Sequence, residues 1–208
     1  MQSPTHHTAS SARTSPSHID TAQSARTAWS LLTFIALAVV GCALDLITKE
    51  WAFERLGSPL VQQGVPEPPI WIIEGVFGFE TNLNEGALFG IGQGQVRAFT
   101  VLSIATGVGI VLWVIFARVL RDLHLTISLG LVMGGILGNL YDRLGLHGLT
   151  WRGVLRHHEP GQPVYAVRDW LHFKIDAIGF DWPIFNLADS WLVCGAILLV
   201  WHAMRHRE

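Results

Sequence analysis

Four apolar segments divide the chain, at about residues 29–48, 98–117, 123–142 and 182–204. Residues 98–117 contain no charge, and as a helix rising 1.5 Å per residue they are long enough to cross a hydrocarbon core of about 30 Å. The other three segments have similar lengths. The pattern therefore predicts an all-α integral membrane protein with four transmembrane helices.

The connections between these segments have a different character. Residues 50–97 contain four prolines, which break helices, and then two short apolar runs, Ile70–Ile73 and Val76–Phe79, typical of β-strands. We expect a small extracytoplasmic β-sheet here. Residues 144–181 form a second outer loop, in which Tyr165–Ile175 is either a short strand or a surface helix lying over the site. Pro183 suits the first turn of the fourth helix.

Composition and charge refine this topology. Half of the residues are hydrophobic, 14% are charged and the mean hydropathy is +0.38, as in integral membrane proteins. Arginines gather near both ends of the chain and in the turn at residues 118–122, so the positive-inside rule predicts that both termini are cytoplasmic. Residues 1–27 are polar and are expected to be a disordered cytoplasmic tail, preceding a single membrane domain at 28–208.

Polar residues concentrate at one end of the apolar segments. The first segment ends near Asp45 and Lys49, and the fourth begins near Asn186 and Asp189. The third ends with Asn139, Asp142 and Arg143, which share a helix face and are accompanied by glycines that allow close helix approach. Since consecutive spans alternate in direction, all of these groups lie on the outer side. Ionisable groups within a membrane are usually functional. For Asp45 and Lys49, an interfacial ion pair with Lys49 reaching water is the structural alternative.

Asp189 is predicted to lie about 10 Å inside its helix, where a carboxylate needs a polar partner. Asp169, flanked by apolar residues in the outer loop, is the candidate. Two carboxylates in a site of low dielectric share a proton and can activate water by general acid–base catalysis. Asp176 and Asp181 are the fallback candidates. Residues 157–159 (His-His-Glu) form the one metal-like cluster, and adjacent residues are poorly placed to share an ion, so we expect no metal and no cofactor.

Three alternatives to a catalytic site remain at this point. Residues 39–42 (Val-Val-Gly-Cys) fit a lipoprotein cleavage site, although three further spans follow. Paired carboxylates within a membrane also relay protons in transporters, so a small proton-coupled transporter is the main alternative. A purely structural polar network is the third. Both Cys42 and Cys194 fall inside predicted spans, where we expect them to pack in an apolar environment.

Five motifs in order resemble the bacterial lipoprotein signal peptidase (signal peptidase II) family. They are residues 45–49 (Asp-Leu-Ile-Thr-Lys), 84–89 (Asn-Glu-Gly-Ala-Leu-Phe), 138–143 (Gly-Asn-Leu-Tyr-Asp-Arg), 168–170 (Arg-Asp-Trp) and 185–190 (Phe-Asn-Leu-Ala-Asp-Ser). The resemblance runs from about Ala28 to Met204. It implies an aspartic endopeptidase of the bacterial inner membrane, acting on its outer side on lipidated prolipoproteins just before the diacylglyceryl-modified cysteine.

The resemblance also implies roles for individual residues. Asp169 and Asp189 match the catalytic dyad. The matching positions that shape the site or hold the substrate are Asp45, Lys49, Asn84, Gly86, Asn139, Asp142, Arg143 and Asn186. The expected partners are lipidated prolipoproteins and membrane lipid, with no nucleic acid, and the expected state is a monomer. Two departures are Trp170, where the family usually has phenylalanine, and a longer stretch between Arg143 and Asp169.

Overall fold

The computed structural model describes residues 18–58, 60–63, 65–86, 92–117, 119–153 and 158–205. Its four long helices are α1 (His18–Leu56), α2 (Val96–Phe116), α3 (Leu123–Arg143) and α4 (Leu187–Arg205). Each is long and apolar enough to cross a membrane, the part of α1 concerned being Gln23–Leu56. The prediction of four spans is confirmed.

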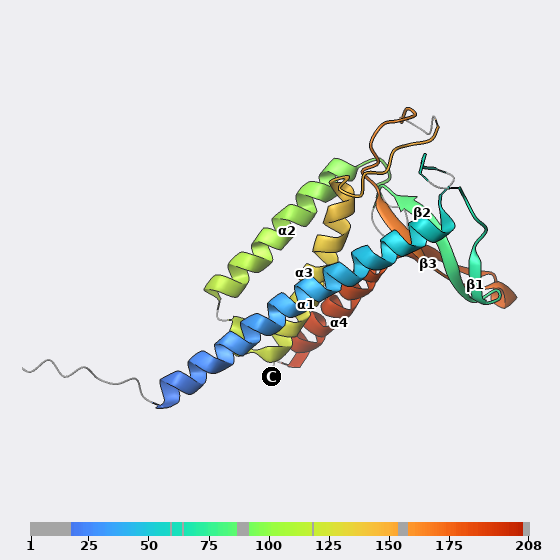
Figure 1. The fold of residues 1–208 in the computed structure, drawn as a ribbon. Helices are drawn as coiled ribbons and strands as arrows, with labels where there is room; N and C mark the ends of the chain where they lie inside the picture. Colours follow the sequence, from blue (N-terminus) through green and yellow to red (C-terminus); the bar gives the residue numbers. More distant parts are fainter. Residues whose placement is uncertain are drawn as a thin grey trace, which may run out of the picture.

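Helix α3 lies at the centre of the bundle and packs against α1, α4 and α2 (Figure 1). Glycines on α3 make the close approach to α1 and α4 possible. A Cβ atom at Gly138 would collide with the Asp45 carboxylate, and one at Gly135 would lie 2.5 Å from the Ala188 carbonyl oxygen. The glycines therefore bring three helices together at the end of the bundle where the predicted polar residues lie.

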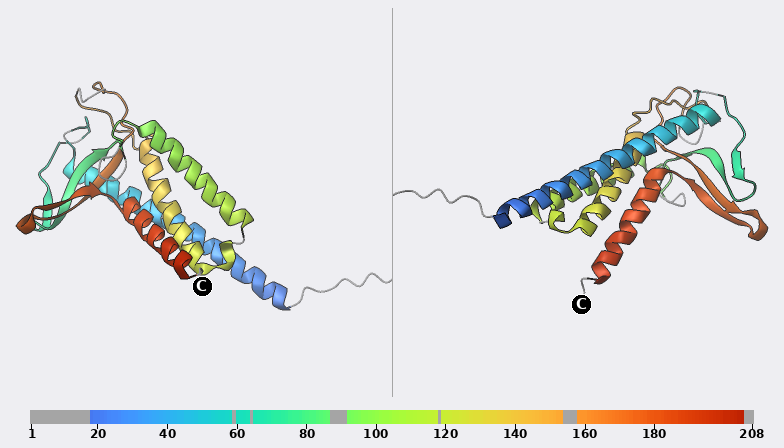
Figure 2. Two further views of the ribbon diagram at one scale, coloured as in Figure 1. Left: turned by 180° about the vertical axis from the view of Figure 1, so that it is seen from behind. Right: turned by 60° about the horizontal axis from the view of Figure 1, so that its bottom comes forward.

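A four-stranded antiparallel sheet projects from that same end of the bundle, as all views show (Figures 1 and 2). Its strands are β1 (Ile70–Ile73), β2 (Phe77–Asn84), β3 (Val167–Ile175) and β4 (Phe180–Phe185), in the order β1-β2-β3-β4. The described residues also form two short helices, η2 (Val119–Arg121) and η3 (Asp176–Ile178). The segment from Tyr165 to Ile175 is thus largely a strand, and its Asp169 lies opposite Asn82 of β2.

An aromatic cluster fixes the sheet to the end of α1. The Trp51 ring of α1 makes edge contacts with Phe79 of β2, at 5.4 Å between centroids, and with Trp170 of β3, at 5.8 Å. Phe79 and Trp170 are themselves 5.2 Å apart. Such aromatic pairs contribute about 0.5–1.5 kcal/mol each beyond the area they bury, so strand β3 and its Asp169 are held firmly over the bundle.

Two predicted boundaries are wrong. Helix α1 begins at His18, so residues 18–27 are helical rather than part of a tail; residues 1–17 lie outside the described residues. Helix α4 begins at Leu187 rather than near residue 182, and Pro183 lies in strand β4 instead of a helical first turn. Strand β4 is an edge strand, where a proline is tolerated because its missing N–H need not join a ladder.

Candidate active site

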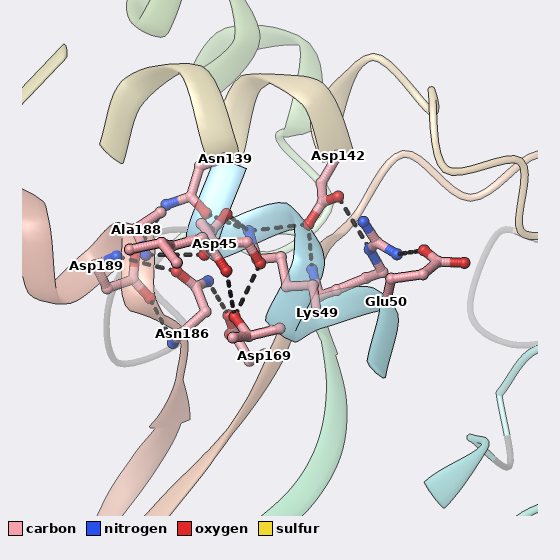
Figure 3. A network of polar contacts seen from close by, with 12 residues as sticks. Asp45, Lys49, Glu50, Asn139, Asp142, Asp169, Asn186, Ala188 and Asp189 are labelled. Atoms are coloured by element: carbon pink, nitrogen blue, oxygen red, sulfur yellow. Dashed lines mark hydrogen bonds and ion pairs between the residues drawn. The ribbon is translucent and has the colours of Figure 1, made fainter. Parts of the chain in front are cut away.

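Lys49 is the centre of a buried polar network beneath the sheet (Figure 3). Its Nζ atom lies 2.7 Å from Asp45 Oδ2 and 3.1 Å from Asp142 Oδ2, and it donates to Asn139 Oδ1 at 3.0 Å. The ammonium group is thus surrounded by two carboxylates, with which it forms ion pairs, and by one amide oxygen, to which it donates a hydrogen bond. The side chains of Lys49, Asp45 and Asp142 are 0% exposed. Lys49 therefore does not reach water at the interface, and that alternative is wrong.

Arg168 extends the network to the outer side. Its backbone N–H and its Nε atom donate to the two oxygens of Asp142, at 2.9 and 3.0 Å, and Nη1 lies 2.7 Å from Glu50 Oε2. Arg168 is 2% exposed. In the sequence this arginine stood out only as part of a motif. Alternation along a strand places it on the face opposite Asp169, so a firm prediction of β3 would have been the signal that revealed it.

The first turn of α4 is held by side chains that accept its free N–H groups. Asn186 Oδ1 accepts from the Asp189 N–H at 3.0 Å, while Asp189 Oδ2 accepts from the Asn186 N–H at 3.4 Å, as in a capping box. Asp45 Oδ1 accepts from the Ala188 N–H at 2.9 Å. Asp189 thus lies in the first turn of α4. The predicted depth of about 10 Å inside the helix is wrong, because α4 begins five residues later than expected.

Asp169 and Asp189 are connected through Asn186, and each carboxylate accepts a hydrogen bond from a side-chain amide (Figure 3). Asn186 Nδ2 donates to Asp169 Oδ1 at 2.6 Å, and Asn139 Nδ2 donates to Asp189 Oδ1 at 2.9 Å. Because Asn186 contacts both acids, it fixes their relative position. Asn139 also accepts from Lys49, so the amide is oriented with its nitrogen toward Asp189.

Asp169 is fully buried, and this has an electrostatic consequence. Burial, and then the nearby negative charge of Asp189, raise the pKa of Asp169 well above its ordinary value, against the opposing effects of Lys49, Asn186 and Asn84. Its second oxygen, Oδ2, is buried and accepts no hydrogen bond from the described residues. A raised pKa favours the protonated form of Asp169, so the pair can present one protonated and one charged carboxyl group.

The segment before α2 contributes a turn at residues 84–86. Asn84 Oδ1 accepts from the Gly86 N–H at 2.9 Å and from Gln93 Nε2 at 3.2 Å. Arg143 Nη2 donates to the Gly86 carbonyl at 3.1 Å, which connects this turn to the end of α3. Residues 87–89 of the corresponding motif lie outside the described residues.

Two cavities open beside Asp189. A polar one of about 390 Å³ reaches toward the sheet, and its lining includes Asn82, Asn84, His172, Asp181 and Asp189. An apolar one of about 380 Å³ is lined by Phe173, Trp182, Phe185, Asp189, Ser190, Val193 and Cys194. Asp189 contributes to both cavities and therefore lies between a polar and an apolar space.

The fallback acids lie in more exposed surroundings. Asp181 is at the rim of the polar cavity, with its side chain 69% exposed, and it contacts His172 at 2.8 Å. The His172 ring also contacts Glu80 at 2.8 Å, which connects β2 to β4 across β3 and was not anticipated. Asp176 pairs with Lys174 at 3.2 Å. Neither acid belongs to the buried network that joins Asp169 to Asp189.

The metal-like cluster falls partly outside the described residues, because His157 is not among them. His158 contacts Glu85 instead. Within the described part of the chain, no three His, Cys, Asp or Glu side chains gather as a metal site requires. Cys42 and Cys194 are free thiols.

The fold and this network define a multi-pass membrane protein with a buried acid, Asp169, and a partly buried acid, Asp189, under a small sheet. The chain belongs to the signal peptidase II family, whose model matches residues 37–205. It is 44% identical over 167 residues to the lipoprotein signal peptidase of Rhodopirellula baltica, covering 80% of this chain and 69% of that one. It is 39% identical over 170 residues to that of Streptomyces griseus, covering 82% and 72%.

Solved structures agree with this assignment. A bacterial membrane enzyme determined by the in meso method at 2.3 Å resolution superposes with a TM-score of 0.64 at 25% identity, covering 85% of this chain and 90% of that one. A second such enzyme, at 1.9 Å resolution, gives a TM-score of 0.61 at 25% identity, covering 84% and 94%. The chain is therefore a multi-pass membrane protease of bacterial type.

Proposed function

We propose that this chain is an aspartic endopeptidase that removes signal peptides from lipoproteins, cutting just before the diacylglyceryl-modified cysteine. Family membership supports the removal of lipoprotein signal peptides. The observation that supports the aspartic chemistry is the pair formed by the buried Asp169 and the partly buried Asp189, which Asn186 holds together. A pair of acids with one shared proton supplies both a base and an acid at a single peptide bond.

The proposed reaction follows from that shared proton. The charged carboxylate of the pair accepts a proton from a water molecule, whose oxygen attacks the scissile carbonyl carbon. The protonated carboxyl group donates a hydrogen bond to the carbonyl oxygen and so stabilises the developing negative charge. A proton then passes to the leaving amine, and the C–N bond breaks. Neither acid forms a covalent bond to the substrate.

The two cavities suggest how the substrate lies. We propose that the peptide backbone occupies the polar cavity, and that apolar parts of the lipidated substrate occupy the cavity formed by Phe173, Phe185 and Val193. Asp189 lies between the two. Arg143 and Gly86 then shape the wall that faces the peptide, while Asp45, Lys49 and Asp142 hold the helix ends in place.

The orientation is proposed from charge. Arg121 and Arg205 lie at the opposite end of the bundle from the sheet, so the positive-inside rule places that end, with both termini, in the cytoplasm. The sheet and the acid pair then face the extracytoplasmic side. We propose a single membrane domain that acts as a monomer.

A proton-coupled transporter would use the same carboxylates but needs a polar path to the opposite face. Below the network, Phe34, Ala38, Ile110, Leu129 and Met133 pack together, and the polar residues buried in the described part of the bundle there (Ser30, Thr126 and Ser128) are uncharged. This arrangement favours the peptidase.

The test is cleavage of a lipidated prolipoprotein by the purified protein. Asp169→Asn and Asp189→Asn should each abolish cleavage while the protein still inserts and accumulates, because asparagine keeps the shape but carries no transferable proton. Asp181→Asn is the matched control: it alters an acid of the same cavity that does not belong to the pair, and should leave cleavage largely intact. EDTA should have no effect. Robust cleavage by Asp169→Asn, together with loss of activity in Asp181→Asn, would move the catalytic role to Asp181.

A further inference from the structure

The long connection between α3 and β3 contains a folded hairpin on the outer side, formed by residues 149–153 and 158–164 and called here the outer hairpin. Its two arms are joined by hydrogen bonds from the Val164 N–H to the Leu149 carbonyl and from the Trp151 N–H to the Gln162 carbonyl, both 2.9 Å. One arm also pairs with the segment after α1, where the Gln62 N–H donates to the Thr150 carbonyl at 2.9 Å. The hairpin is therefore attached to the rest of the protein.

Trp151 anchors the outer hairpin. Its side chain is 2% exposed and belongs to a second hydrophobic core, which includes Phe53 of α1 and Leu83 of β2. Full burial of a side chain this large contributes several times the ~0.8 kcal/mol of one buried methylene group. The indole ring is thereby fixed relative to both α1 and β2.

His158 uses this fixed ring as a platform. The two rings are stacked, with centroids 4.4 Å apart and planes 8° from parallel. One edge of the imidazole faces the turn at residues 84–86, where His158 Nε2 lies 2.5 Å from Glu85 Oε1. Glu85 is only 7% exposed, so water contributes little to holding its carboxylate, and the imidazole has a correspondingly larger effect on its position.

Glu85 lies between two residues of the candidate active site. On one side is Asn84, whose side chain favours the charged form of Asp169, and on the other is Gly86, whose carbonyl accepts from Arg143. We propose that Trp151, His158 and Glu85 form a brace that positions the 84–86 turn against the catalytic pair. His158 and Glu85 are then positioning residues, and the outer hairpin contributes to cleavage without touching the substrate. This inference rests on the proposed peptidase function.

Two substitutions of His158 separate the parts of the brace. His158→Phe keeps an aromatic ring that can stack on Trp151 but removes the contact with Glu85. His158→Gln loses the stacking but keeps an amide that can donate to Glu85. The matched control is Gln63→Ala, because Gln63 also holds the hairpin, donating to Thr150 Oγ1 at 3.1 Å, yet it does not contact the turn.

Kinetics on the detergent-solubilised enzyme should distinguish positioning from a general structural role. His158→Phe should lower kcat on the order of tenfold, the size typical of losing one charge-assisted hydrogen bond, with KM within about twofold of wild type. His158→Gln should recover part of kcat. Gln63→Ala should resemble wild type. Glu85→Gln, which keeps the shape of the side chain, should also lower kcat. It replaces His158→Phe as the test if that variant does not accumulate.

The pH profile of kcat is a second measurement that a purely structural role would not move. Asn84 favours the charged form of Asp169, so displacing the turn should raise the pKa of Asp169 further and move the alkaline limb of the profile, where the protonated acid of the pair loses its proton, to higher pH. The other charged groups that act on Asp169, Lys49 of α1 and Asp189 of α4, are unchanged in these variants.

Two results would overturn the brace. One is wild-type kcat and pH profile in both His158→Phe and Glu85→Gln. The other is a loss in Gln63→Ala as large as that in His158→Phe, which would show that the whole hairpin matters only for stability. Cleavage by wild type and its absence in Asp189→Asn decide the proposed function separately, so failure of the brace would be distinguishable from failure of the peptidase assignment.

Discussion

Replacing Lys49 by methionine removes the ammonium group that lies between Asp45 and Asp142 while keeping a side chain of similar length. All three side chains are 0% exposed, so water does not take the place of the missing cation. Removing one partner of a buried ion pair typically costs about 3–5 kcal/mol, because a buried charge is left uncompensated. For a protein of this size, 1 kcal/mol corresponds to roughly 2–4 °C in Tm, so we expect Lys49→Met to lower Tm by about 6–20 °C.

Thermal unfolding of the purified protein in detergent, followed by tryptophan fluorescence, measures this change. Arg55→Met is the matched control, since Arg55 is a cation near the end of the same helix but is exposed. Its effect should stay within about 0.5 kcal/mol, as for most surface substitutions. The double variant Lys49→Met with Asp45→Asn should recover part of the loss, because it removes one of the two carboxylates left without a cation.

A Tm for Lys49→Met within about 2 °C of wild type, well below the range expected for a broken buried ion pair, would refute the reasoning. It would show that Asp45 and Asp142 do not depend on the ammonium group, so that the network around Lys49 contributes little to stability. An equal loss in Lys49→Met and Arg55→Met would also contradict it, because burial would then have no influence on the cost.

Three further predictions follow from the same contacts. Burial raises the pKa of Asp169 in the folded protein, so wild type loses stability as pH rises above the ordinary aspartate pKa of about 3.9. Asp169→Asn should therefore have a higher Tm than wild type at about pH 7. This difference in Tm should disappear near pH 4. In steady-state kinetics, Asn186→Ala and Arg143→Ala should each reduce kcat/KM by roughly ten- to a hundredfold, with membrane insertion unchanged. Unchanged kinetics in both variants would show that these residues do not belong to the site. In a cysteine-free background, Glu67→Cys should be labelled from outside intact cells and Arg121→Cys should be protected, and the reverse pattern would invert the proposed topology.

The helices could be predicted from the sequence because each corresponds to a long, continuous run of mostly apolar residues. A run of about twenty apolar residues is long enough to span a bilayer as a helix and too long for a typical strand, and α2 and α3 begin and end within two residues of the predicted positions. The prediction of where α4 begins was wrong for a physical reason. The run at residues 182–185 within strand β4 is apolar and short, and a short apolar run is consistent with either a strand or a helix. Its pairing with β3 decides the outcome, and that pairing is not visible in the local pattern.

In the candidate site, too, local sequence patterns predicted some features, whereas contacts between distant parts of the chain could not be predicted. Spacing alone placed Asn139 and Asp142 on one face of α3, and both are buried in the network. Sequence did not reveal that Lys49 is buried, because a lysine at a helix end more often extends to water. Arg168 and His172 were missed because their partners, Glu50 and Glu80, are about a hundred residues distant in the sequence. Contacts of this kind depend on how the sheet folds back over α1.

The length of α1 has a mechanical consequence. Its 39 residues span about 58 Å, nearly twice the thickness of a hydrocarbon core, and the helix continues without a break from the bundle to the aromatic cluster under the sheet. Asp45 and Lys49 lie on the same continuous rod as Trp51. One unbroken helix therefore connects the bundle to the aromatic cluster under the sheet, and with the proposed function the depth of the acid pair in the bilayer follows the placement of α1. Membrane thickness should accordingly alter how often a substrate bond reaches the acids, and leave unchanged which bond is cut.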